Sequence, residues 1–205
     1  MLFMLICLIQ IQIGQTHERS AEDCELDLRR GTAGPNKGFR YYYDKELAMC
    51  FKYYFEGNDE GYNSFATEDD CFAYCIPQDY NTCGANKSPN GFCSDLMKCP
   101  DHSSCRFGGF GFGICCDKQT EEDWNNDYTP KCENGGEVVQ LERWWGKTEL
   151  LGKSCDHKFC PGDSTCHSGK WLSYCCKSRS RANRVKGESR QIIAADSPTQ
   201  ASMSY

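Results

Sequence analysis

The stretch that decides the fold runs from Cys24 to Cys75 and reads CELDLRRGTAGPNKGFRYYYDKELAMCFKYYFEGNDEGYNSFATEDDCFAYC. Two aromatic runs, at residues 40–44 and 51–55, lie on either side of a short polar segment that ends at Ala48. Aromatic side chains favour strands, and two such runs separated by a few residues are typical of a β-hairpin. The sequence therefore predicts a hairpin in the first half of this stretch.

A short helix is expected in the second half. Thr67 precedes three acidic residues, and a threonine at this place can cap a helix whose positively charged first turn the acids stabilise. Cys71 and Cys75 lie one helical turn apart, so they share a face. Both cysteines can then reach back to the hairpin and to the segment that begins at Cys24.

This frame resembles the Kunitz, or bovine pancreatic trypsin inhibitor, domain. The 20 residues between Cys50 and Cys71 and the three between Cys71 and Cys75 match that family. For residues 24–75 the resemblance implies an α+β fold, a twisted hairpin followed by a C-terminal helix. It also implies disulfides between Cys24 and Cys75 and between Cys50 and Cys71.

In inhibitory Kunitz domains a rigid loop enters a serine protease as a substrate does. The resemblance assigns this role to six residues: Gly34, Pro35, Asn36, Lys37, Gly38 and Asn58. Counted from the aromatic strand, Gly34 and Asn58 stand where the family has its third disulfide, so the loop lacks that anchor and glycine adds backbone freedom. The same count makes Pro35 the residue for the specificity pocket. A gap placed after the loop gives Lys37 instead, which suits a trypsin-like enzyme.

Composition indicates an exported protein. The chain has 205 residues, 17 cysteines and a net charge of -6, which is not the profile of a cytosolic enzyme. Residues 2–13 are almost wholly apolar but too short to span a bilayer, so residues 1–16 are predicted to be a secretory signal peptide. Its removal takes away Cys7 and leaves 16 cysteines, an even number that can pair in an oxidising compartment.

The remaining cysteines fall into separate blocks of four, six and six. The two later blocks, at 83–116 and 132–176, repeat one another. In order, Cys83, Cys93, Cys99, Cys105, Cys115 and Cys116 align with Cys132, Cys155, Cys160, Cys166, Cys175 and Cys176. The motif resembles lustrin-type cysteine-rich repeats of extracellular matrix. Two short β-rich modules held by disulfides are expected, with a longer strand over 138–145 and with 15 pairings open in each block.

Segments outside these modules have other expected roles. Residues 117–131 are acidic and are predicted to be a solvated linker. Residues 177–205 are basic and predicted to be disordered. Most tails of this kind are only solvated, and the alternatives are that this one binds acidic matrix sugars or folds against the acidic modules. Asn86 begins an Asn-Lys-Ser sequence and is a candidate for N-glycosylation.

Neither an enzyme site nor a cofactor site is predicted. The sequence shows no nucleophile beside a base, no paired carboxylates, no phosphate loop and no nucleic-acid motif. One cluster has the density of a metal site: Cys155, His157, Cys160, Cys166 and His167. Secretion and the absence of a histidine at the matching position of the first repeat favour disulfides there over metal ligands.

The function predicted is that of a secreted, non-enzymatic Kunitz-type protein with a degenerate binding loop. Its expected partners are extracellular serine proteases, which it modulates or localises, and components of the matrix or cuticle. Binding to nucleic acid is not expected, nor is binding to a membrane once the signal is removed. A resemblance to nematode proteins of the blistered-cuticle group implies cuticle formation and moulting. Two alternatives stay open: an ordinary inhibitor that uses Lys37, and a structural matrix protein that binds no protease.

Overall fold

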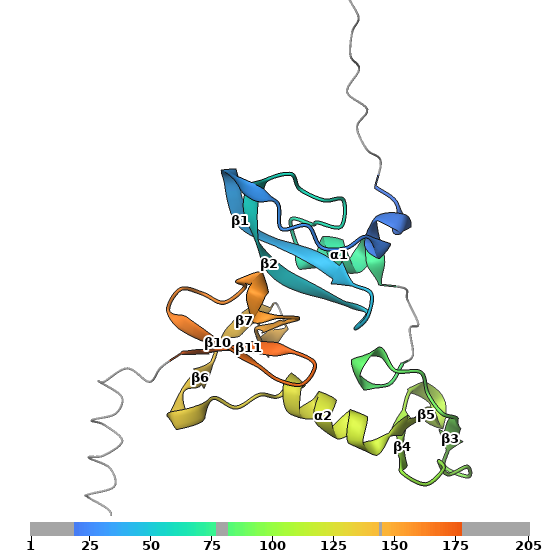
Figure 1. The fold of residues 1–205 in the computed structure, drawn as a ribbon. Coiled ribbons are helices and arrows are strands. Elements are labelled where there is room, and N and C mark those ends of the chain that lie inside the picture. The colour runs from blue at the N-terminus through green and yellow to red at the C-terminus, as the bar shows by residue number, and fades with distance from the viewer. Residues whose placement is uncertain (1–18, 77–81, 144, 178–205) are drawn as a thin grey trace, which may run out of the picture.

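The computed structural model describes residues 19–76, 82–143 and 145–177 (Figure 1). The expected signal peptide at 1–16 lies outside the described residues. So does the expected basic tail, apart from its first residue, Lys177.

Residues 19–76 form the predicted hairpin and helix. The elements are η1 (Ala21–Glu25), β1 (Thr32–Asp44), β2 (Met49–Asn58) and α1 (Glu68–Cys75). Pairing of Asp44 with Met49 closes the hairpin over the expected polar turn, so the hairpin is confirmed. The helix cap is also confirmed, because the Thr67 hydroxyl oxygen accepts a hydrogen bond from the Asp70 backbone N–H at 3.1 Å.

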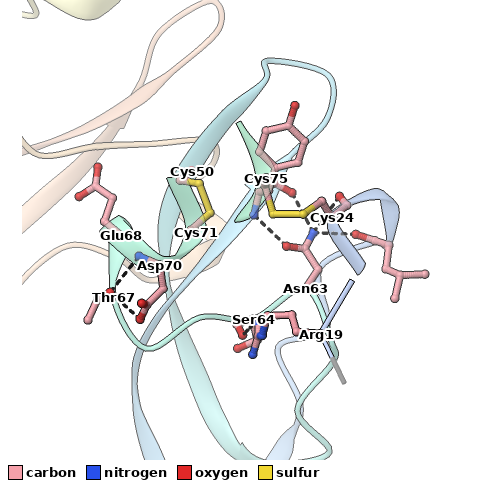
Figure 2. Close-up of a disulfide and its surroundings, with 12 residues drawn as sticks. Arg19, Cys24, Cys50, Asn63, Ser64, Thr67, Glu68, Asp70, Cys71 and Cys75 are labelled. Atoms are coloured by element: carbon pink, nitrogen blue, oxygen red, sulfur yellow. Dashed lines mark hydrogen bonds between the residues drawn. A yellow bond between two sulfur atoms is a disulfide. The ribbon is translucent and has the colours of Figure 1, made fainter. Parts of the chain in front are cut away.

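Two disulfides and one buried amide fasten this module (Figure 2). The disulfides join Cys24 to Cys75 and Cys50 to Cys71, the pairs that the family resemblance implies. Asn63 is buried and accepts a hydrogen bond from the Tyr43 N–H at 2.9 Å. Its side-chain nitrogen donates to the Tyr43 and Leu26 carbonyls, each at 2.8 Å. One side chain therefore satisfies buried backbone groups of both the hairpin and the N-terminal arm.

Each six-cysteine block forms a small sheet. In the first repeat β3 (Phe92–Ser94), β5 (Phe112–Asp117) and β4 (Ser103–Phe107) lie side by side in that order, with η2 (Gly84–Asn86) and η3 (Gly109–Gly111) beside them. In the second repeat β10 (Ser164–Ser168), β11 (Ser173–Lys177) and β6 (Glu137–Val138) form the sheet, and β9 (Leu151–Gly152) also pairs with β11. The remaining elements there are η4 (Glu133–Gly135), β7 (Gln140–Arg143), β8 (Gly146–Glu149) and η5 (Cys155–His157).

The two repeats have the same disulfide pattern, in which the first cysteine bonds the sixth, the second the fourth and the third the fifth. The first repeat has Cys83–Cys116, Cys93–Cys105 and Cys99–Cys115. The second has Cys132–Cys176, Cys155–Cys166 and Cys160–Cys175. In both, the fourth cysteine lies opposite the fifth across the strand pair. The pattern agrees with a duplicated unit.

The expected long strand over 138–145 is wrong for the described part of that segment. β6 ends at Val138 and pairs with β11, whereas β7 begins at Gln140 and pairs with β8. The buried Val139 between them donates its N–H to Cys175 and accepts from the Leu150 N–H, each at 2.8 Å. These two bonds separate the chain into two short strands with different partners.

The acidic segment at 117–131 also differs from the prediction of a solvated linker. It contains a helix, α2 (Lys118–Tyr128), capped by the Asp117 carboxylate, which accepts from the Thr120 N–H at 2.8 Å. Asp127 is buried and accepts hydrogen bonds from the backbone N–H groups of Trp171 and Leu172, the second at 3.0 Å. The helix packs because its acids satisfy donors of the second repeat, which the local charge pattern did not indicate.

All three modules contribute to one hydrophobic core. Its buried members are Tyr42, Leu47, Phe51, Tyr53 and Phe55 from the hairpin, Ala85 from the first repeat and Leu172 from the second. Cysteine spacing predicts three separate modules, and every described disulfide does lie within its own block. The apolar contacts nevertheless join the blocks, because the hairpin face would otherwise remain exposed to water. None of the helices in the described ranges is long and apolar enough to cross a membrane.

We expect Leu172→Ala to destabilise the whole protein, the N-terminal module included. Leu172 is 1% exposed in the shared core, and removing a buried leucine side chain costs about 2–5 kcal/mol of unfolding free energy. Thermal unfolding with intact disulfides should show a lower midpoint, and amide exchange at Tyr53 should accelerate. Leu96→Ala is the matched control, because Leu96 is 98% exposed. Unchanged exchange at Tyr53 in the Leu172 variant would contradict the shared core.

Candidate functional site

The expected binding loop is a wide interruption in the pairing of β1 with β2. Ala33 pairs with Gly57 and Gly38 pairs with Phe55, so residues 34–37 stand opposite the single residue Glu56. Pro35, Asn36 and Lys37 are all exposed. A bulge of this kind bends a strand and redirects its side chains, and here it presents three of them to solvent.

Gly34 and Asn58, the pair at which the family resemblance implies a third disulfide, meet across the hairpin. A Cβ atom on Gly34 would lie 2.3 Å from the Asn58 Cγ, so the amide group fills the space beside the glycine. Gly57 has φ +120°, and a Cβ atom there would lie 2.5 Å from the Gly34 carbonyl carbon. Gly57 is needed for this close approach of the strands, whereas Gly34 leaves room for the Asn58 amide group.

Hydrogen bonds hold the base of the expected binding loop. The side-chain nitrogen of Asn58 donates to the Ala33 carbonyl at 3.1 Å. Next to it, the Thr32 hydroxyl donates to the Asp59 carboxylate at 2.7 Å. Polar contacts between the start of β1 and the end of β2 therefore anchor the loop, and they are weaker and more easily broken than a covalent bridge.

The second repeat contacts Glu56, the β2 residue that lies opposite the loop. The Glu56 Oε1 atom accepts from Arg30 Nη2 at 3.0 Å and from Lys158 Nζ at 2.9 Å. Arg30 also donates to the Asp156 carbonyl in η5. The hydrogen bond and charge of Lys158, followed by those of Arg30, hold the pKa of Glu56 below its usual value. Sequence reasoning missed this cluster, since 102 positions separate Glu56 from Lys158 and no local pattern links them.

The cysteines and histidines of the metal-like cluster have other partners. Cys155 is bonded to Cys166, and Cys160 is bonded to Cys175. His157 lies against the hairpin, with its Nδ1 atom 3.4 Å from the Tyr42 hydroxyl. Burial, and then the charge of Arg30, lowers the pKa of His157.

His167 of the same cluster stacks on Tyr174, with ring centres 5.5 Å apart. The structure therefore does not bring the two histidines together with free thiolates.

Asn86, the glycosylation candidate, is half-buried beside the hairpin turn. Its side-chain nitrogen, the atom that would carry a glycan, donates to the Lys45 carbonyl at 3.4 Å. Its backbone has φ 54°. Modification of this residue stays a prediction.

Comparisons with known proteins agree with the geometry of residues 24–75. The model of the Kunitz/bovine pancreatic trypsin inhibitor domain matches residues 23–76. A BPTI/Kunitz inhibitor domain-containing protein of Caenorhabditis elegans is 42% identical over 158 residues, which cover 75% of this chain and 89% of the relative. Major allergen Ani s 1 of Anisakis simplex is 31% identical over 170 residues, which cover 76% of this chain and 87% of the allergen. Both alignments extend well beyond the domain match. No solved structure matches the chain significantly.

We expect Asn58→Ala to loosen the loop. The substitution removes the bond to the Ala33 carbonyl, a contact of about 0.5–1.5 kcal/mol, and opens space beside Gly34. Amide exchange at 34–38 and limited proteolysis in the loop should both become faster. Asn36→Ala serves as the control, since Asn36 is exposed within the same loop. Equal exchange in the two variants would show that Asn58 is not an anchor.

Proposed function

The chain belongs to the Kunitz/bovine pancreatic trypsin inhibitor domain family, and we propose that it binds serine proteases through residues 34–38 without blocking them tightly. Kunitz domains are inhibitors rather than enzymes, and serine proteases are their usual targets. The observation that carries the proposal is the contact between Gly34 and the Asn58 amide, two positions at which the family resemblance implies a third disulfide.

The difference in anchor strength explains why binding would be weak. A native disulfide in a small secreted domain contributes roughly 2–5 kcal/mol, whereas a hydrogen bond contributes about 0.5–1.5 kcal/mol. A less restrained loop loses more conformational entropy when a protease orders it. If the protease cleaves such a loop, the new ends separate more readily, so rejoining competes poorly with release.

Placement of Gly34 beside Asn58 supports Pro35 as the residue for the specificity pocket. Pro35 directly follows the glycine and is exposed. Its ring cannot extend into a deep pocket, and its fixed φ restricts how the loop can adapt to an active site. Both properties favour shallow, reversible docking that modulates or localises a protease.

The proposed setting is the extracellular matrix, in cuticle formation and moulting. The eight disulfides of the described chain fit an oxidising, extracellular compartment. The likeness of residues 83–176 to lustrin-type repeats, and of the whole layout to nematode cuticle proteins, supports retention by the matrix. Retention would place the loop near matrix proteases.

Titration of residues 17–205 against trypsin-, chymotrypsin- and elastase-like enzymes tests the function. We expect partial and reversible changes of activity, and no stoichiometric block. Tight trypsin inhibition that Lys37→Ala abolishes would instead establish the ordinary inhibitor, which the exposure of Lys37 favours. Lys147→Ala, at an exposed lysine of the second repeat, is the control for charge loss. If neither activity assays nor direct binding measurements detect a protease complex, both the weak-binding proposal and the ordinary-inhibitor alternative are contradicted.

Restoring the bridge should convert the loop into a stronger inhibitor. In the double variant Gly34→Cys with Asn58→Cys, a disulfide can form where the amide now lies. We expect affinity for a responsive protease to rise by about tenfold or more, equivalent to about 1.4 kcal/mol per decade. Gly34→Ser with Asn58→Ser is the matched control without a bridge. Equal affinity of the two double variants would mean that loop stiffness does not limit binding.

A further inference from the structure

A groove of about 480 Å³ lies beside β2, and Phe51 of the shared core forms part of its lining. Its walls come from α1, β2, the β7–β8 hairpin and the end of α2. Tyr41 lies within it, and the aromatic side chains of Phe72, Tyr128 and Trp145 are exposed on its lining. This volume is large enough for a short peptide segment or a small ligand. Stacked aromatic faces also attract cationic groups.

Carboxylates outnumber cations along this groove. Among the described residues that line it, the acids are Glu68, Asp69, Glu142 and Glu149, and the cations are Lys52 and Arg143. Arg143 is already paired with Glu68, which joins the β7–β8 hairpin to α1. Within the described chain, Asp69 and Glu149 have no side-chain hydrogen bond or ion pair, so their charges are available to an incoming cation.

The groove's remaining cation, Lys52, is directed elsewhere. Its ammonium nitrogen lies 4.1 Å from the centre of the Phe39 ring. Burial lowers the pKa of Lys52. The groove is thus an acidic and aromatic surface. Its lining cations, Lys52 and Arg143, already have partners, and Lys147 beside it pairs with Glu142.

The chain itself carries a segment of matching chemistry. Residues 178–205 contain five Lys or Arg against two acids, and the rest of the chain has 18 basic and 27 acidic residues. Arg179, Arg181 and Arg184 come first, and the apolar pair Ile192 and Ile193 follows. Guanidinium groups pair with carboxylates and stack on aromatic rings, while the isoleucines suit apolar lining.

The segment starts close enough to reach the groove. Tyr174 pairs with Leu151, which lines the groove, and β11 ends three residues later at Lys177. Three strand residues span about 10 Å, and an extended chain covers about 3.3 Å per residue, so fewer than ten of the 28 residues suffice for the return. A tether of this length also gives an effective concentration on the order of millimolar.

We propose that residues 178–205 dock in the groove, with their arginines on Asp69, Glu149 and the exposed aromatic rings. This intramolecular contact covers an acidic surface of the modules with the basic end of the same chain. It is independent of protease binding, since the groove lies on the α1 and β7–β8 side and excludes residues 34–38.

Nuclear magnetic resonance of the full mature chain and of a chain ending at Lys177 tests the proposal. We expect shift differences for the Trp145 indole and for amides in α1 and β7–β8. A synthetic peptide of residues 178–205, added to the shortened chain, should reproduce those shifts. High salt should reverse them, because screening shortens the reach of the charges.

Two sets of variants complete the test. The double variant Asp69→Asn with Glu149→Gln should weaken binding of the peptide to the shortened chain by about five- to tenfold at low salt. Asp101→Asn with Glu122→Gln removes the same charge from exposed sites outside the groove and should not weaken it. Identical spectra of long and short chains, away from Lys177, would overturn the proposal. Shifts that grow with the concentration of the shortened chain alone would also overturn it, because they assign the groove to a second copy.

Discussion

Burial of the β1–β2 hairpin on both faces is the constraint on which the other features depend. Disulfides at Cys50 and Cys24 hold α1 and η1 against one face. The aromatic face that includes Phe51 and Tyr53 is covered instead by residues of the two repeats, Leu172 among them. A domain of about fifty residues buries too little surface to remain stable easily by itself, so an added apolar cover has a large effect. The family's domain is here one part of a larger folded unit.

Contacts with the second repeat help to hold the proposed binding loop. Its base depends on the Asn58 amide and on Glu56, which receives Lys158 from the second repeat. Such contacts position the loop, but they break and re-form readily, whereas a disulfide stays closed. Since the pKa of Glu56 is lowered in the folded protein, this pairing contributes stability at neutral pH and loses it as pH falls through the lowered pKa. Loop order therefore depends on solution conditions as well as on covalent structure.

Local sequence was sufficient for the hairpin turn and the Thr67 cap, since neighbouring residues determine both of them. The juxtaposition of Gly34 with Asn58 was implied by the family resemblance instead. Contacts between distant segments were not predictable in this way. An acidic stretch has the same composition whether it is solvated or, as in α2, supplies Asp127 to buried N–H groups. Cysteine counts likewise fixed the blocks but left 15 pairings open, because pairing depends on which strands lie side by side.

The two repeats share one disulfide pattern but differ in their contacts with the hairpin, and the difference arises in the first loop. The segment between Cys132 and Cys155 is longer than that between Cys83 and Cys93 and contains the β7–β8 hairpin. That hairpin reaches α1 through Arg143 and forms one wall of the acidic groove. Directly after the same loop, η5 leads to Lys158, which contacts Glu56 beside the proposed binding loop. The disulfide pattern that both repeats share fixes the frame of each, so an insertion between the cysteines can add contacts without disturbing the sheet.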